Sequence, residues 1–236
     1  MTDPKPSPIC ASGTPSLFVG LLALSVALAL VPTVWSTLDL RAAALFVGPT
    51  AQVHAVDWWW VVWINAYIPT VFRYGLGLAF ASWLAATLVA RWQAWRLPLA
   101  FVLVAGVLGP GVVVNWGFKD NWQRARPYQV ENFGGTQKFS RATVMTDQCD
   151  ANCSFVSGHV ACGIFLASLG LVHRRRQRTW AALGVACGLI IGFARMADVA
   201  HWLSDVLWAF PITLGTSWLV WKGLQRLYRN PSITEG

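Results

Sequence analysis

The sequence predicts an all-α polytopic membrane protein, in which a bundle of six transmembrane helices uses the whole chain, residues 1–236, as one domain. Apolar residues make up 56% of the chain and charged residues only 12%, whereas a soluble domain has about 25% charged residues. The 15 tryptophans point the same way, because the indole ring favours the membrane–water interface. Long apolar runs separated by short basic turns complete the pattern.

Each predicted span is an apolar run close to the roughly 20 residues that a helix needs to cross a bilayer. The predicted spans are 17–35, 67–90, 97–118, 157–172, 179–194 and 202–221. We expect the first span to be retained, since a cleaved signal peptide has a shorter apolar core behind a more basic start. Residues 39–65 are mixed in character, so we expect a segment at the membrane interface with a short amphipathic helix.

The basic residues predict how the bundle is oriented. Six spans place both termini on one side, together with the turns at Arg91 and at residues 174–178, and ten of the 18 Lys and Arg residues fall there. The positive-inside rule makes this side cytoplasmic, with residues 1–16 as a short N-terminus and 222–236 as a tail. The net charge of +8 is therefore a topology signal, and no nucleic-acid partner is expected.

The longest polar loop, residues 119–154, falls on the outer side and contains Cys149 and Cys153. An oxidising outer compartment favours a disulfide between them over two free thiols. The loop offers too few further ligands for a zinc site. Gly134 and Gly135 predict a turn within it.

The first candidate motif begins this loop with Lys119 and Arg126, followed by Pro127. Seven residues separate the two cations, so they would share one face if the stretch is helical. Proline disfavours helix at the residue before it, so we expect the helix to end there. The alternative is that both are ordinary basic residues at the membrane interface, whose long side chains extend to the lipid headgroups.

The second motif, Ser157-Gly158-His159, opens the fourth span. The start of a helix offers unpaired N–H groups and a positive dipole end, which suit a phosphate. Glycine allows close approach of a ligand to the backbone, and Ser157 is placed to cap the helix. The alternative is a capped helix with an interfacial histidine.

The third motif contains Arg195, His201 and Asp205. The last two are four residues apart and would share a helix face, where a carboxylate fixes the tautomer of an imidazole. A turn near Asp198 would leave Arg195 at the end of one span and His201 at the start of the next. The alternative is a structural His–Asp pair, but ionisable groups at membrane depth are costly and favour a function.

Together the three motifs bring three cations, two imidazoles and one carboxylate to the outer face, which is what metal-independent phosphoryl transfer requires. Cations neutralise phosphate oxygens, one imidazole attacks phosphorus, and the other protonates the departing alkoxide. No metal and no cofactor are expected.

The pattern Lys119-x6-Arg126-Pro127, Ser157-Gly158-His159 and Arg195-x5-His201-x3-Asp205 resembles the three signature motifs of the type 2 phosphatidic acid phosphatase superfamily. That superfamily also includes vanadium haloperoxidases and glucose-6-phosphatase. The chain departs from the family at Val156, where proline is usual, and at Ala194, where serine is common; no acid, base or nucleophile is missing.

The resemblance implies a role for each motif residue and a six-helix core. His201 would be the nucleophile that forms a phosphohistidine, Asp205 would orient it, and His159 would protonate the leaving group. Phosphate would be bound by the remaining motif residues: Lys119, Arg126, Arg195, Ser157 and the N–H of Gly158.

The implied substrate is a phosphorylated lipid in the bilayer. The stretches 152–159 and 133–135 are similar to bacterial lipid A phosphatases, and phosphatidylglycerophosphate, phosphatidic acid and undecaprenyl pyrophosphate are the neighbouring possibilities. Arg124, Lys138 and Arg141 would suit a large anionic head group or form a solvated rim. The layout suits a bacterial inner membrane with the site facing the periplasm or cell exterior.

Two alternatives to a lipid phosphatase remain. A lipid phosphotransferase, which passes the phosphate to a second lipid, needs the same residues. A non-enzymatic transporter would break its helices near the midplane and show repeats, whereas here the ionisable residues gather at one face.

Overall fold

The computed structural model describes residues 15–47 and 57–229. The predicted N-terminal segment lies almost wholly outside these ranges, as do the end of the predicted tail and the middle of the predicted interfacial segment. The described chain is helical apart from the long polar loop and short connections, so the predicted fold class, an all-α polytopic membrane protein, is confirmed.

Eight α-helices and several short turns of other helix types follow one another along the described chain. The α-helices are α1 (Ser16–Val34), α2 (Thr37–Ala44), α3 (Trp59–Leu88), α4 (Arg96–Gly106), α5 (Asp120–Trp122), α6 (Gly158–Ser168), α7 (Gln177–Ala197) and α8 (Leu203–Arg229). The turns are η2 (Ala90–Trp95), η4 (Pro127–Gln129), η5 (Glu131–Phe133), η6 (Leu169–Leu171) and η7 (Arg174–Arg176). A π-helical stretch, η3 (Val107–Lys119), continues α4 toward the polar loop.

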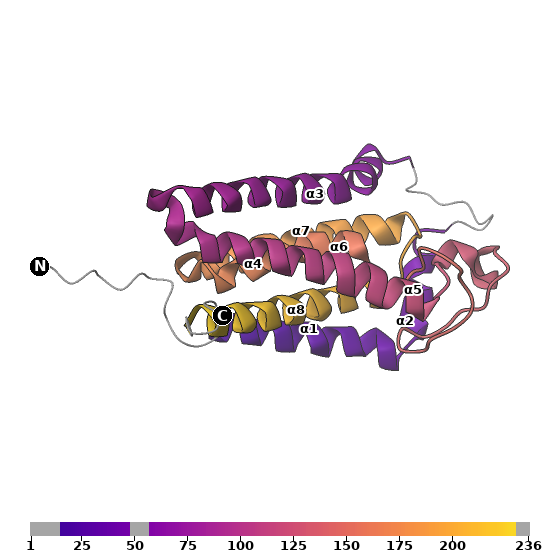
Figure 1. The fold of residues 1–236 in the computed structure, drawn as a ribbon. Coiled ribbons are helices and arrows are strands. Elements are labelled where there is room, and N and C mark those ends of the chain that lie inside the picture. Colours follow the sequence, from indigo (N-terminus) through magenta and orange to yellow (C-terminus); the bar gives the residue numbers. More distant parts are fainter. Residues whose placement is uncertain (1–14, 48–56, 230–236) are drawn as a thin grey trace, which may run out of the picture.

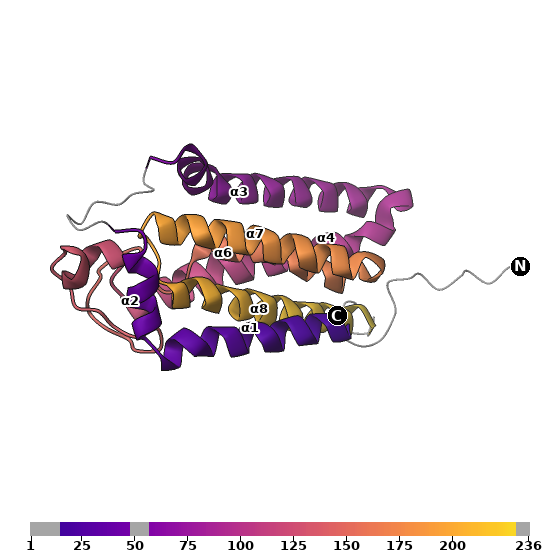
Figure 2. The same cartoon turned by 180° about the vertical axis from the view of Figure 1, so that it is seen from behind.

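The long helices run alongside one another and form one bundle (Figure 1). α1 packs along α8, and α6 lies in the centre against both α7 and α8. α3 lies on one side of the bundle, where α4 and α7 are its main neighbours (Figure 2). The short helix α2, the loop after η3 and the α7–α8 connection gather at one end of the bundle, while the η2 and η7 turns lie at the other.

Five helical segments of the described chain are long and apolar enough to cross a membrane, whereas the sequence predicts six spans. The segment predicted at residues 157–172 is shorter than expected, because the apolar helix there covers only Gly158–Leu171. Glycine and small residues place it inside the bundle, and most of α6 is buried. A helix enclosed by others in this way faces protein more than lipid.

The boundaries of two predicted spans differ from the structure. α3 begins at Trp59, not near residue 67, so the tryptophan cluster expected at the interface belongs to a 30-residue helix. The short helix expected in the interfacial segment is α2. α8 continues to Arg229, so residues 222–229 of the predicted tail are helical and continuous with the last span.

α6 and α7 approach closely because glycines lie between them. A β-carbon added at Gly184 of α7 would lie 2.3 Å from the backbone nitrogen of Ala167. A β-carbon at Gly163 of α6 would lie 3.1 Å from backbone atoms of α7. Small residues permit such close backbone contact between membrane helices, where the hydrophobic effect does not drive association.

We therefore expect Gly184→Ala to lower the thermal stability of the purified protein. The added methyl group meets backbone atoms that cannot rotate away, and overpacking of this kind costs about 1–3 kcal/mol. Gly215→Ala in α8 is the matched control, since nothing lies within 4 Å of its β-carbon position. The melting temperature in detergent is the measurement, and equal values for both variants would contradict the close α6–α7 contact.

Candidate active site

The three sequence motifs meet at the end of the bundle where α2 lies (Figures 1 and 2). The N–H of Ser157 donates to the backbone carbonyl of Asp205 at 3.3 Å, which joins the start of α6 to the first turn of α8. The N–H of His201 donates to the carbonyl of Arg195 at 3.2 Å. The turn expected near Asp198 is present, and it separates Arg195 in α7 from His201, which lies just before α8.

Lys119 and Arg126 are brought together by a common partner, Asn152. Lys119 Nζ donates to the Asn152 side-chain oxygen at 3.1 Å, and Arg126 Nε and Nη2 donate to its carbonyl at 3.1 and 2.7 Å. The helical spacing that was expected to align the two cations is absent, because α5 ends at Trp122 and Gln123 is left-handed, with φ 49°. Tertiary contacts, not helix periodicity, place these two cations.

The peptide that holds both cations lies in a loop closed by a disulfide. Cys149 and Cys153 are joined, with their Cα atoms 5.7 Å apart. Asn152, between them, has φ 50°, a left-handed conformation that asparagine adopts more readily than most residues. The cross-link therefore restricts the conformations of the segment that fixes Lys119 and Arg126.

Arg195 is held by Asn65, a residue of α3 outside the three motifs. Arg195 Nη1 donates to the Asn65 side-chain oxygen, and Asn65 Nδ2 donates to Asp198 at 3.0 Å. The Asn65 carbonyl also lies 3.1 Å from Nε2 of His159. A carbonyl only accepts, so Nε2 of His159 carries a proton in this arrangement. Asn65 was not anticipated from the sequence, where the available signal was a single amide side chain in an apolar stretch.

Several buried polar atoms at this end have no hydrogen-bond partner among the described residues. They include Ser157 Oγ, Arg195 Nε and both ring nitrogens of His201. An unsatisfied buried group costs about 1–3 kcal/mol, so such a group calls for an explanation such as a polar ligand. The cap expected from Ser157 is absent, because its side chain makes no hydrogen bond to α6. Its hydroxyl is therefore available to a ligand.

Gly158 begins α6 beside Asn115 of η3. A β-carbon at Gly158 would lie 2.9 Å from the Asn115 side-chain oxygen. Only glycine therefore fits here without displacing a neighbour, and the first N–H groups of α6 remain close to the unpartnered polar atoms of Ser157.

His201 lies at the centre of these charges and is only 2% exposed. Burial lowers its pKa well below the usual 6.5, and the positive charges of Arg195, Arg126 and Lys119 lower it further. Nδ1 lies 3.7 Å from the nearer oxygen of Asp205, too far for a hydrogen bond. The Asp205 carboxylate thus lies near the ring but does not offset the lowering of the His201 pKa by burial. The imidazole is therefore neutral at neutral pH.

Asp205 is held in place by neighbours on both of its oxygens. Ser154 Oγ and the N–H of Trp202 donate to Oδ2, the latter at 2.9 Å. Arg124 Nη1 donates to Oδ1 at 2.5 Å. The carboxylate that faces His201 is therefore fixed by three donors from the polar loop and the start of α8.

Arg124 corrects a sequence prediction. It was expected to bind a head group or to lie in a solvated rim, but its side chain is completely buried. It forms ion pairs with Asp205 and with Asp39 of α2, the second at 2.8 Å, and donates to the Ser140 carbonyl at 3.0 Å. The rings of Phe139 and Trp202 lie 5.8 and 5.3 Å from its guanidinium carbon.

Asp39 was not anticipated from the sequence. It is completely buried, and it accepts hydrogen bonds from the N–H and hydroxyl of Ser204 at 2.8 and 2.6 Å as well as from Arg124. Burial raises its pKa, and the charge of Arg124 opposes that shift. A carboxylate in an otherwise weakly charged helix was the signal that could have identified it.

Lys138 and Arg141, the two loop cations that were grouped with Arg124 in the sequence, are exposed.

One end of this membrane bundle thus brings three buried cations and two imidazoles around unpartnered polar atoms, an arrangement whose chemistry suits an oxyanion. Residues 93–229, well over half of the chain, match the family model of the PAP2 superfamily. The chain therefore belongs to the PAP2 superfamily, as the three motifs indicated.

The chain is also similar to three curated proteins, each named lipid A 4'-phosphatase. It is 37% identical over 134 residues to the protein of Francisella tularensis subsp. novicida (strain U112), which is 56% of this chain and 60% of that protein. The identities are 33% over 130 residues for Rhizobium leguminosarum and 34% over 134 residues for Rhizobium etli. These matches cover 54% and 56% of this chain, and 56% and 52% of those relatives. The chain thus spans little more than half the length of these relatives, and no solved structure matches it significantly.

Removal of the Arg124 charge is expected to disrupt this end of the bundle. Arg124→Met leaves Asp39 and Asp205 buried without their cation, and breaking a buried ion pair from one side costs about 3–5 kcal/mol. Arg141→Met removes one exposed cation from the same loop and serves as the control. We expect the melting temperature to fall only for Arg124→Met; a shift of the same size in both variants would refute the structural role of the buried pair.

The imidazole of His201 is expected to stay neutral through pH 6.5. Its pKa is lowered, so acidification must pass well below 6.5 before the ring is protonated. The measurement is NMR of the protein with labelled histidines, and His201→Gln identifies the signal by its absence. Titration of that signal at or above pH 6.5 would show that the ring is less buried, or closer to a carboxylate, than the structure indicates.

Proposed function

We propose that this protein is an integral membrane lipid phosphatase that hydrolyses a phosphomonoester or pyrophosphate through a phosphohistidine, without a metal ion. The observation that supports the proposal most is the set of buried, unpartnered atoms of Ser157, Arg195 and His201, beside the cations Lys119 and Arg126. A phosphate group would satisfy these polar atoms and be neutralised by the surrounding positive charge.

In the first step, Nε2 of His201 attacks phosphorus. Nδ1 is the ring nitrogen nearer Asp205, so Nε2 is the nitrogen free to react. A bond forms between Nε2 and phosphorus while the bond from phosphorus to the leaving oxygen breaks. Lys119, Arg126 and Arg195 stabilise the charge that develops on the other phosphate oxygens.

His159 supplies the proton that the leaving alkoxide needs. In the arrangement of the structure its Nε2–H points at the Asn65 carbonyl. For the transfer, His159 must be the imidazolium, which the negative charge of the bound phosphate favours; it turns one N–H to the leaving oxygen, gives up that proton and becomes neutral. In the second step water attacks the phosphohistidine, His159 takes a proton from that water, and the bond between phosphorus and Nε2 breaks. Inorganic phosphate and neutral His201 are the products.

Lipid A is the substrate that we place first. The three relatives named above are lipid A 4'-phosphatases, and their similarity supports a phosphomonoester on a saccharolipid. The exposed cations Lys138 and Arg141 lie in the polar loop at the site end of the bundle, where they would meet the other charges of a large head group.

The same proposal places the site on the periplasmic side of a bacterial inner membrane. Basic residues are concentrated in the turns η2 and η7, at the opposite end of the bundle from the three motifs. The positive-inside rule makes that basic end cytoplasmic. The site would then meet lipids in the outer leaflet of the inner membrane.

The test is phosphate release by the purified protein in detergent with EDTA. The panel contains lipid A, phosphatidylglycerophosphate, phosphatidic acid and undecaprenyl pyrophosphate. We expect release from lipid A, a loss of at least about 10,000-fold in His201→Ala, and a smaller loss of about 100- to 10,000-fold in His159→Ala, since a nucleophile outweighs a general acid. His173→Ala, an exposed histidine at the far end of the bundle, is the matched control and should retain activity.

Other outcomes separate the alternatives. Release that requires a divalent metal, or that survives in His201→Ala, would overturn the assignment of the site. No release by the folded protein, followed by transfer of phosphate once an acceptor lipid is added, would identify a phosphotransferase. Preference for another lipid of the panel would keep the mechanism and change the substrate.

A further inference from the structure

Two apolar grooves lie at the basic end of the bundle, far from the proposed active site. The first has a volume of about 510 Å³ and lies where the C-terminal part of α3 meets η2 and α4. The second, of about 540 Å³, lies between η2 and α4 on one side and η6, η7 and α7 on the other. Both volumes fall in the range of about 300–1,000 Å³ that is typical of ligand sites.

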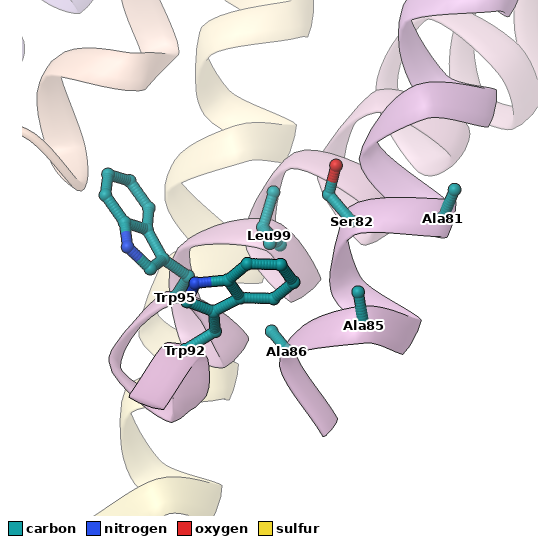
Figure 3. Close-up of a pocket in the computed structure, with 7 residues that line it drawn as sticks. All are labelled: Ala81, Ser82, Ala85, Ala86, Trp92, Trp95 and Leu99. Atoms are coloured by element: carbon teal, nitrogen blue, oxygen red, sulfur yellow. The ribbon is translucent and has the colours of Figure 1, made fainter. Parts of the chain in front are cut away.

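The grooves are neighbours, because Trp95 and Leu99 line both. In the first groove, Figure 3 shows the Trp92 ring lying above Ala86 and the Trp95 ring directed away from α3. The two apolar grooves thus adjoin at Trp95 and Leu99, at the same end of the bundle.

The second groove combines apolar walls with a basic rim. Val172 and Trp180 line it together with Arg174 and Arg175. Nη2 of Arg174 is buried and has no hydrogen-bond partner among the described residues. No salt bridge within residues 15–47 and 57–229 involves either arginine. A buried, unpartnered guanidinium nitrogen beside an apolar channel calls for a hydrogen-bond acceptor, and an anionic acceptor forms the strongest such bond with a cation.

The distribution of charge excludes a protein carboxylate as that anion within the described residues. Ten acidic residues occur in the sequence, and Asp3 and Glu235 lie outside the described ranges. The other eight all lie at the active-site end, in α2, at the start of α3, in the loop after η3 or around the α7–α8 turn. The end with the two grooves therefore has positive charge without described negative charge.

We propose that these grooves bind one molecule of an anionic phospholipid, in the leaflet opposite the active site. Its phosphate contacts Arg174 and Arg175, and its two acyl chains occupy the grooves on either side of Trp95. Basic pockets between membrane helices on the cytoplasmic side recognise anionic head groups by the same chemistry. This lipid is a bound structural ligand and not the substrate, so the inference does not depend on the proposed function.

The test is native mass spectrometry of the full chain with dioleoyl phosphatidylglycerol and dioleoyl phosphatidylcholine at equal concentrations. All variants also contain Arg195→Ala, which weakens the retention of a lipid phosphate at the proposed active site. We expect one phosphatidylglycerol to bind at least about tenfold more tightly than phosphatidylcholine. Arg174→Ala with Arg175→Ala should abolish that preference, a loss of about tenfold in affinity for two charge-assisted contacts.

Two further variants keep the test decisive. Arg178→Ala removes an exposed charge from the same basic segment but does not line the groove, and it should bind as the unmodified protein does. Leu99 lines both grooves, so the larger side chain in Leu99→Trp would occupy part of their volume. This variant should reduce the binding of both lipids without changing the charge. Equal affinity for the two lipids, or equal losses in Arg174→Ala/Arg175→Ala and Arg178→Ala, would overturn the proposal.

Discussion

The buried guanidinium of Arg124 is the interaction on which the arrangement of the site end depends. It pairs with Asp39 of α2 and with Asp205 of α8, and it comes from the loop that begins with Lys119. Three segments distant in the sequence are thus joined by one charged group that no water reaches. Removing one partner would leave an uncompensated buried charge, so each segment constrains the other two. The carboxylate beside His201 acquires its position from this network.

The cations of the site are likewise placed by residues outside the motifs. Asn152 holds Lys119 and Arg126 through its side chain and carbonyl, and Asn65 holds Arg195. Both amides satisfy part of the hydrogen-bonding capacity of the cations, and Asp198 also pairs with Arg195 at 3.3 Å. The cations are therefore held in fixed orientations, which in the mechanism that we propose would lower the cost of reorganisation as charge develops on a bound phosphate.

The two ends of the molecule have opposite chemical characters. All acidic residues of the described ranges lie at the end of the bundle where the three motifs meet. The other end carries arginines in η2 and η7 that no described carboxylate balances. By the positive-inside rule this asymmetry favours the orientation that we propose, with the basic end in the cytoplasm. It also leaves each end with its own set of cations, available to a different anionic group.

The sequence by itself determined the fold class, most of the spans and the three motifs, because apolar length and motif spacing are local properties of the chain. The sequence did not predict the positions of those polar side chains that are set by contacts between segments distant in the chain. Arg124 appeared to be a surface cation but is buried, since only the folded chain brings Asp39 and Asp205 to it. Asn65 and Asn152 acquired roles in the same way, and the helix expected to align Lys119 with its partner ends early. Pairing of buried polar groups is a property of three-dimensional neighbours, and spacing along the chain does not encode it.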